Sequence, residues 1–169
     1  MANIRLIRGR IKSAKNIAQI TRAMELVAAS KMKKAQAAAV SGKLYAQKIY
    51  EMVYELSRQV KIATHPLIAK PIHPEAKKLV IIISTNKGLC GGLNANLFRY
   101  LHAQYGTGEQ CIFLTLGRKG ASFTAQMKWN LEEDFSGSVF VDTVPALVEL
   151  AISRFVRGDL SGVEIVFYE

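Results

Sequence analysis

Apolar residues recur at alternating spacings of three and four along the first sixty residues. From Ile4 to Val60 there is no proline, and the only glycines are Gly9 and Gly42, so one continuous helix is allowed. A repeat averaging 3.5 residues over eight heptads is typical of a left-handed coiled coil rather than of a helix lying on a globular core. The positions assigned to this coiled-coil seam are Ile4, Ile7, Ile11, Ala14, Ala18, Ala28, Met32, Ala35, Ala39, Ile49, Val53 and Leu56.

A second apolar ridge lies beside the seam, at Ile17, Ile20, Met24 and Val27. It makes the helix apolar on more than one side over residues 17–28, which indicates that partners surround it there. The alternative is a single widened apolar face turned to one core. The alanines in the middle of the seam require any partner helix to approach closely.

After residue 61 the pattern changes, and Pro66, Pro71 and Pro74 predict a linker over residues 62–76. Strand and helix patterns then alternate, which favours a Rossmann-like parallel α/β domain over residues 77–169. The helices of this domain are too short to cover the seam, so residues 1–61 are expected to be a separate unit. Strands are predicted at 79–84, 111–116, 139–141 and 163–168, and helices at 94–104, 119–128 and 145–157.

The positive charge is confined to the N-terminal third of the chain. The net charge is +10, and residues 1–61 hold 13 basic residues against three glutamates, while residues 62–169 are balanced at ten of each sign. This asymmetry implies an acidic partner, and nucleic acid, an anionic membrane and an acidic protein surface are all admissible. A purely solvated basic face is the other interpretation. The first forty residues contain no aromatic side chain that could stack on single-stranded nucleic acid.

Other features narrow the class of protein. The N-terminus lacks the apolar block of a signal peptide, and the longest strongly apolar run, residues 79–83, is too short to cross a bilayer. We therefore expect a soluble or peripheral protein. Cys90 and Cys111 are not spaced as a zinc or redox pair, so reduced thiols are expected. His65 and His73 lack companion ligands, and neither a metal nor a cofactor is predicted.

One loop permits an enzymatic interpretation. Residues 84–94 follow a strand and open a helix, where nucleotide-binding folds hold phosphate. The loop lacks the spacing of a P-loop or of a dinucleotide-binding loop. A tight structural turn, with Asn94 capping the helix, is favoured, and Cys90 would still need a catalytic base. No catalytic residue is assigned.

Two long motifs resemble the γ subunit of the F-type ATP synthase. They are Ile20-Thr-Arg-Ala-Met-Glu-Leu-Val-Ala-Ala-Ser-Lys-Met32 and Gly88-Leu-Cys-Gly-Gly-Leu-Asn94. The resemblance extends over residues 1–169 but corresponds to only the first three-fifths or so of such a subunit. The fold it implies is α/β: a long N-terminal coiled-coil helix and a Rossmann-like parallel α/β domain, truncated before the C-terminal helix of the family.

The resemblance implies a non-catalytic rotor subunit in the central stalk of the F1 sector. Its N-terminal helix would pair antiparallel with the missing C-terminal helix inside the ring of α and β subunits, where ATP chemistry occurs. Further partners would be the ε subunit and the membrane c ring, with rotation transmitted during proton-driven ATP synthesis. Membrane contact would be indirect, on the cytoplasmic face of the bacterial inner membrane, and no nucleic acid would be bound.

Within the long helix, the resemblance assigns a partner-subunit interface to Met24, Val27, Lys31, Lys33 and Lys34, facing acidic loops of the catalytic subunits. It makes the loop at residues 88–94 a structural landmark rather than an active site. Asn86 and Lys87 stand where the family pattern has an acidic residue and an arginine. The alternative function is a basic coiled-coil adaptor or a nucleic-acid-associated protein.

Overall fold

The structure, a computed structural model, describes residues 2–59, 65–67, 71–137 and 140–168. The chain divides into two compact units, residues 1–61 and 62–169, and each is considered by itself. Part of the predicted linker, residues 62–64 and 68–70, lies outside the described residues. In chain order the elements are α1 (Ala2–Gln59), β1 (Lys78–Ile83), α2 (Leu93–Tyr105), β2 (Cys111–Leu116), α3 (Arg118–Gln126), β3 (Leu131–Asp134), α4 (Phe140–Arg157) and β4 (Gly162–Val166).

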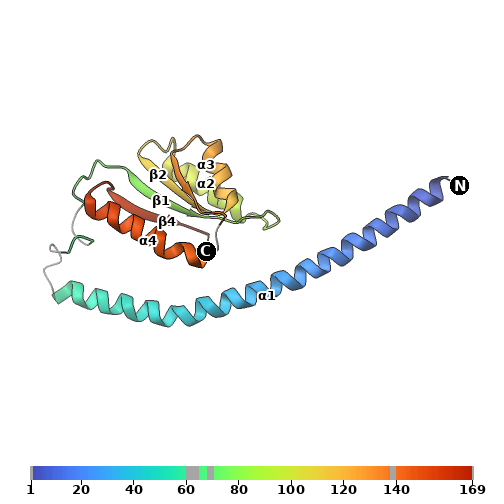
Figure 1. The fold of residues 1–169 in the computed structure, drawn as a ribbon, viewed down its shortest axis with the longest axis horizontal. Coiled ribbons are helices and arrows are strands. Elements are labelled where there is room, and N and C mark those ends of the chain that lie inside the picture. The colour runs from blue at the N-terminus through green and yellow to red at the C-terminus, as the bar shows by residue number, and fades with distance from the viewer. Residues whose placement is uncertain (1, 60–64, 68–70, 138–139, 169) are drawn as a thin grey trace. The chain divides into compact units, whose positions relative to one another are not determined.

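The first unit is the single helix α1, 58 residues long. It forms one unbroken, gently curved ribbon (Figure 1). Alanine and lysine, which are good helix formers, are its commonest residues, and no proline interrupts its hydrogen bonds. At 1.5 Å per residue such a helix is about 85 Å long. The predicted continuous helix is confirmed.

The second unit is a four-stranded parallel sheet in the order β3-β2-β1-β4. β1 lies in the middle and pairs with β2 from Lys78↔Cys111 to Ile83↔Leu116. Its pairing with β4 joins segments far apart in the sequence, beginning at Lys78↔Gly162. Apolar runs in β1 and β2 are buried on both faces, as expected for inner strands of a parallel sheet. The predicted α/β class is confirmed.

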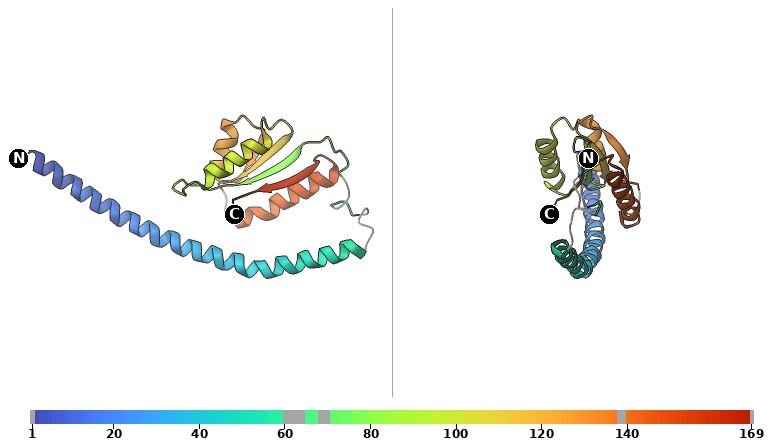
Figure 2. Two further views of the ribbon diagram at one scale, coloured as in Figure 1. Left: turned by 180° about the vertical axis from the view of Figure 1, so that it is seen from behind. Right: turned by 90° about the vertical axis from the view of Figure 1, so that its left-hand side faces the viewer.

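Helices cover both faces of the sheet. α2 and α3 lie on one face and α4 on the other, which the two views of Figure 2 also show. Alternate residues of β1 point to opposite sides, so Val80 packs with α2 while Leu79 packs with α4. Beneath α2 and α3 the rings of Phe113 and Trp129 stack with their centroids 4.5 Å apart.

Two details of the predicted order are wrong. The strand expected at residues 139–141 does not form, because Phe140 begins α4; residue 139 lies outside the described residues. The helix expected to start at Pro145 therefore starts five residues earlier and contains this proline. The sheet instead gains β3, which was not predicted and pairs with β2 at Phe113↔Leu131.

Candidate functional site: the surface of the long helix

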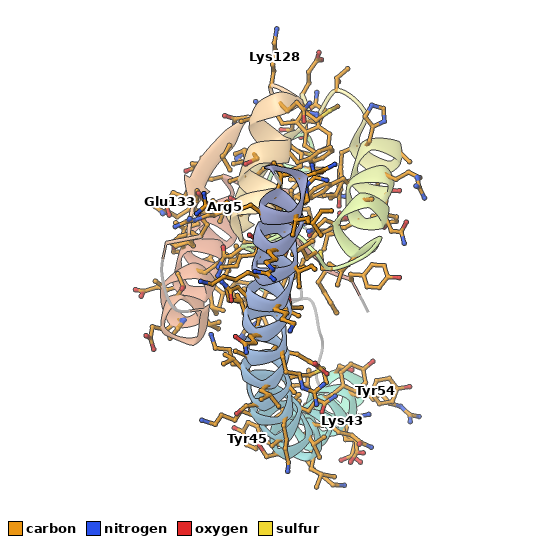
Figure 3. All side chains as sticks on the ribbon, turned by 90° about the vertical axis from the view of Figure 1, so that its right-hand side faces the viewer. Arg5, Lys43, Tyr45, Tyr54, Lys128 and Glu133 are labelled. Carbon is orange, nitrogen blue, oxygen red and sulfur yellow. The ribbon has the colours of Figure 1, made fainter. Side chains whose placement is uncertain are left out.

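The side chains of α1 are open to solvent along almost its whole length. From Asn3 to Tyr50 every residue is exposed. Among the large side chains of the seam, the exposed fraction ranges from 41% at Ile49 to 62% at Ile4. In Figure 3 the labelled Lys43, Tyr45 and Tyr54 project outward from the helix. An apolar stripe of this length is costly to leave in water, so α1 is built to be covered by something else.

Helical geometry separates the predicted interface residues into two groups. Met24, Val27, Lys31 and Lys34 follow a three-four-three spacing and lie along one flank of the seam. Successive residues of an α-helix are about 100° apart around its axis. Lys33 therefore lies on the opposite flank of the seam. The structure therefore brings four of the five residues together as a flank stripe, defined here as Met24, Val27, Lys31 and Lys34.

The flank stripe carries positive charge with few internal partners. Among the described residues of α1, ion pairs join Arg22 to Glu25 at 3.1 Å and Lys48 to Glu51 at 2.7 Å. Both are exposed pairs within one helix and contribute little. No ion pair is found for Lys31 or Lys34 in the described part of the chain. An acidic surface brought to this flank would meet cations that are free to pair.

The loop that invited an enzymatic interpretation is held by its own hydrogen bonds. Asn94 does not cap α2, whose N-cap is Gly92. Its Nδ2 instead donates to Thr85 Oγ1 at 2.7 Å and to Cys90 Sγ at 3.2 Å. The predicted cap is wrong because the helix begins one residue before Asn94, which leaves its amide to tie the loop to the end of β1.

Side chains that follow β1 also bind the N-terminus of α3. Asn86 Oδ1 accepts a hydrogen bond from the backbone N–H of Arg118 at 3.0 Å. Ser84 Oγ accepts from the N–H of Gly120 at 2.7 Å and donates to the carbonyl of Gly117 at 3.0 Å. A helix N-terminus attracts anions through its free N–H groups. Here two of those N–H groups of α3 are already bound by side chains, so the arrangement fastens α3 to β1.

A polar cluster that the sequence analysis missed lies at the other end of the sheet. Glu164 accepts hydrogen bonds from Lys78 Nζ and from the Tyr105 hydroxyl, both at 2.6 Å. The bonds from Lys78 and then Tyr105 lower the pKa of Glu164. Burial, followed by the bond to Glu164, raises the pKa of Tyr105. The cluster links β1, β4 and α2 and is a structural clamp. It could not be recognised in the sequence because Lys78 and Glu164 are 86 residues apart.

An apolar groove runs between α4 and β4 on the face of the sheet that α4 only partly covers. Its volume is about 410 Å³. It is lined by Leu67, Ile81, Leu147, Val148, Ala151, Ile152, Phe155, Val163 and Ile165.

Groups of three or more potential metal ligands are absent from the residues that the structure describes. Within the same residues, no helix is both long and apolar enough to cross a membrane.

Comparison with known proteins connects both units to one family. The sequence profile of the ATP synthase family matches residues 3–169. The ATP synthase gamma chain of Opitutus terrae is 43% identical over 171 residues, which cover 99% of this chain and 56% of that protein. The gamma chain of Dehalococcoides mccartyi (strain 195) is 38% identical over 178 residues, and that of Legionella pneumophila (strain Corby) 32% over 177. These last two matches each cover 60% of the relative's length.

The chain thus spans 56 to 60% of the length of these curated relatives. The matched region includes at least 99% of this chain, so it spans the sequences of both the long helix and the α/β unit. The exposed helix therefore lies within the region of similarity. The chain belongs to the ATP synthase family, as a relative of its γ chains.

Proposed function

We propose that this chain forms part of the central rotor stalk of an F-type ATP synthase. In this role α1 is one helix of the shaft that carries rotation between the membrane ring and the catalytic subunits during proton-driven ATP synthesis. One observation carries the proposal: a chain that matches γ chains presents a 58-residue helix with an uncovered heptad seam. A shaft inside a ring of other subunits needs this combination, because it must be long, stiff and apolar where it is enclosed.

The chain itself is proposed to be non-catalytic, with ATP chemistry in the α and β subunits. The internal bonding of the loop at residues 84–94 supports this role, since its polar groups are engaged in holding α2 and α3. The remaining partners are proposed to be the ε subunit, the membrane c ring and the helix that corresponds to the C-terminal part of the γ chains. The complex would sit peripherally on the cytoplasmic face of the bacterial inner membrane.

Two surfaces of α1 are proposed to serve different partners. The seam would take the second helix of the shaft, because its heptad spacing suits another helix. The flank stripe would face the catalytic subunits, with Met24 and Val27 in apolar contact and Lys31 and Lys34 opposite acidic loops. Lys33 lies on the other flank and would meet a different subunit of the surrounding ring, since a central shaft is enclosed on all sides.

The test is assembly with α and β subunits of the same source, with a separately expressed C-terminal γ segment supplied. We expect the chain to co-purify with the α and β subunits. Changing Lys31 and Lys34 together to glutamate should weaken assembly at least tenfold or so, because two attractive contacts become repulsive. The single change Lys43→Glu is the matched control; it reverses an exposed cation on the same helix outside the flank stripe and should have a small effect.

Failure of the wild-type chain to assemble under these conditions would contradict the proposed role. Equal effects of the paired change and the control would contradict the placement of the flank stripe. The +10 charge also admits the alternative of a nucleic-acid-associated protein. Binding to duplex DNA or RNA that persists at physiological salt, with a steep dependence on salt concentration, would favour that alternative.

A further inference from the structure

The two edges of the sheet in the α/β unit differ in how they are protected from pairing with another chain. The edge strand β3 carries Glu132, Glu133 and Asp134 and pairs with β2 through an irregular register. Charged side chains and irregular pairing are two of the features by which proteins keep an edge strand from binding another strand. The other edge strand, β4, pairs with β1 without a register shift and contains no proline. The edge of β4 is therefore the one suited to a further strand.

The one charge on β4 does not protect this edge. Glu164 is the only charged residue of the strand, and its two carboxylate oxygens accept hydrogen bonds from Lys78 and Tyr105 of the same unit. It therefore lies on the face that α2 covers. Val163 and Ile165 lie on the other face, where they line the apolar groove beside α4. A strand added here would meet a paired charge on one face and open apolar surface on the other.

The apolar surface beside this edge comes from α4, from β4 and from the two residues that follow β4. Six large side chains there expose 38–58% of their surface: Val148, Ile152, Val163, Ile165, Phe167 and Tyr168. At roughly 150–250 Å² for a large side chain, their exposed parts amount to on the order of 500 Å². A specific interface buries about 800 Å² on each partner. Together with the backbone of the strand, this surface approaches what a stable dimer needs.

We propose that a second copy of this chain binds at this edge, with the two β4 strands antiparallel and Ile165 opposite Ile165 on a twofold axis. A twofold interface uses the same surface on both copies, so each copy completes the edge of the other. In this register Val163 of one copy lies opposite Phe167 of the other, and Gly162 lies opposite Tyr168. The two four-stranded sheets join into one mixed sheet of eight strands, an arrangement that large sheets often adopt.

The sequence of β4 and the residues after it is complementary to itself in this register. On the groove face every opposed pair is apolar, with Ile165 at the axis and Val163 opposite Phe167 on either side of it. A β-branched residue opposite an aromatic one is a favourable cross-strand pair. On the other face Tyr168 lies opposite Gly162, where no described atom is within 4 Å of an added Cβ. The aromatic ring has room there, and an aromatic residue opposite a glycine stabilises an edge pairing.

Charge selects this register over its neighbours. A shift of two residues would place Glu164 opposite Glu164, and like charges directly opposite each other are destabilising. A shift of one residue would turn the apolar side chains to the wrong face. In the proposed register each Glu164 lies opposite Val166 and keeps its bonds to Lys78 and Tyr105. Residues 62–169 hold equal numbers of basic and acidic residues, so no net charge opposes the approach of two α/β units.

This proposal concerns the α/β unit and does not depend on the rotor role, for which the surface of α1 is the evidence. A chain that fails to assemble with α and β subunits would still dimerise through β4. A chain that assembles with them but never pairs through β4 would leave the rotor role intact and contradict only the present proposal. The two failures are therefore distinguishable.

The register can be tested by disulfide cross-linking of the full-length chain in a Cys90→Ser background. Cys111 is buried and is left in place. Opposed residues of antiparallel strands have Cα atoms about 4.5–5.5 Å apart, which a disulfide can span. We expect Ile165→Cys chains to cross-link with themselves under mild oxidation, because the two copies of this residue face each other.

Val163 supplies the matched control, since it lies on the same face of β4. Val163→Cys chains should not cross-link with themselves, because the two positions are four residues, or about 13 Å, apart along the strands. They should cross-link when mixed with Phe167→Cys chains. Strong cross-linking of Val163→Cys with itself, or none of Ile165→Cys, would contradict the proposed pairing.

Affinity can be tested by sedimentation equilibrium of the full-length chain. Ile165→Lys should raise the dimer dissociation constant at least about tenfold, because it places two cations opposite each other at the axis. Leu89→Lys is the control on the exposed loop at residues 84–94, and Ile11→Asp is the control on α1; each should change the constant by less than about threefold. A large effect of Ile11→Asp would mean that the chain associates through its helix, and a wild-type chain that stays monomeric would overturn the proposal.

Amide hydrogen exchange distinguishes a second copy from another occupant of the edge. The exchange of residues 162–168 would be measured at low and high concentrations of the chain alone, and then with a separately expressed segment that corresponds to the C-terminal part of the γ chains. We expect protection to rise with the concentration of the chain, because dimerisation pairs the free N–H groups of β4. Protection that appears only when the segment is added would show that the edge serves that segment, and the proposal would fail.

Discussion

The long helix and the α/β unit deal with apolar side chains in opposite ways. In the α/β unit Phe113, Leu79 and Leu101 are fully buried by neighbours from the same unit. In α1 residues such as Ile17 and Leu44 keep 63% and 73% of their surface in water. The charge differs too, since the excess of +10 lies in residues 1–61, whereas residues 62–169 are balanced. One unit carries its stability within itself, and the other depends on what binds it.

The most severe test of this contrast is a pair of truncations to alanine. Phe113→Ala removes a fully buried ring stacked on Trp129 and should cost about 3–5 kcal/mol of the free energy of unfolding of the α/β unit. Ile11→Ala should leave that free energy unchanged. Urea denaturation followed by the fluorescence of Trp129, the only tryptophan, measures the α/β unit alone. A large effect of Ile11→Ala would show that the helix shares its core.

Gly117 tests how tightly the α/β unit is closed around the end of β1. Its φ is +114°, and an added Cβ would lie 2.2 Å from the carbonyl oxygen of Ser84. Gly117→Ala should therefore destabilise the unit by about 2–4 kcal/mol, from strain and overlap together. The control is Gly88→Ala, where no described atom lies within 4 Å of the added Cβ. Thermal unfolding should show the control within about 0.5 kcal/mol of wild type.

A smaller effect is expected at the clamp formed by Glu164. Glu164→Gln weakens the bonds to Lys78 and Tyr105, and should cost about 1 kcal/mol, since the side chains of Lys78 and Glu164 are about 40% exposed and solvent screens their attraction. The free energy of unfolding of both proteins would be measured across a range of pH. No difference between them at neutral pH would show that the clamp adds nothing to the unit.

The pH dependence of that difference has a defined sign. The pKa of Glu164 is lowered in the folded state, so its contribution is present above the unfolded pKa of about 4.3. It is lost as the pH falls through the lower folded pKa. The pKa values of Lys78 and Tyr105 are raised, so their contributions are present below pH about 10 and are lost above it. The gap between wild type and Glu164→Gln should therefore be widest in between.

The smallest effect should come from the surface of α1. Arg22→Ala breaks the exposed pair with Glu25 and should leave the helix content of the chain nearly unchanged. The free energy of unfolding of the α/β unit should change by less than about 0.5 kcal/mol. Circular dichroism of the helix and the fluorescence of Trp129 would measure the two. A marked loss of helix would mean that α1 is stabilised by its own surface pairs rather than by its partners.

Strong patterns made most of the fold predictable from sequence. The unbroken heptad spacing gave α1 to within two residues, and the apolar runs of β1 and β2 gave the inner strands. β3 was missed because only Leu131 in it is apolar and three acidic residues follow. An edge strand needs little burial, and pairing with β2 rather than its own pattern makes it a strand. The valine-rich start of α4 was predicted to be a strand, but it is helical. There, helix packing outweighs β-propensity.

The candidate site was predictable where it depended on helical spacing alone. The grouping of Met24, Val27, Lys31 and Lys34 follows from 3.6 residues per turn. The same spacing separates Lys33, which the sequence analysis had placed in one interface with them. The role of Asn94 could not be predicted from the sequence. Asparagine favours the N-cap position, but the helix starts one residue before Asn94, and this changes the partners of its side chain. The Glu164 clamp depends on tertiary contacts that sequence spacing does not encode.

The pairing of β1 with β4 has a consequence for how the chain is made. Lys78 cannot pair with Gly162 until Gly162 has been synthesised. At about 5–20 residues per second on the ribosome, the residues between them take roughly 4–17 s to synthesise. During that interval α1 has already emerged, with its seam in water and the sheet not yet closed. Newly made chains thus pass through a period in which an apolar stripe about 85 Å long is open to any binding surface. In the cell, this interval calls for a chaperone or an early partner.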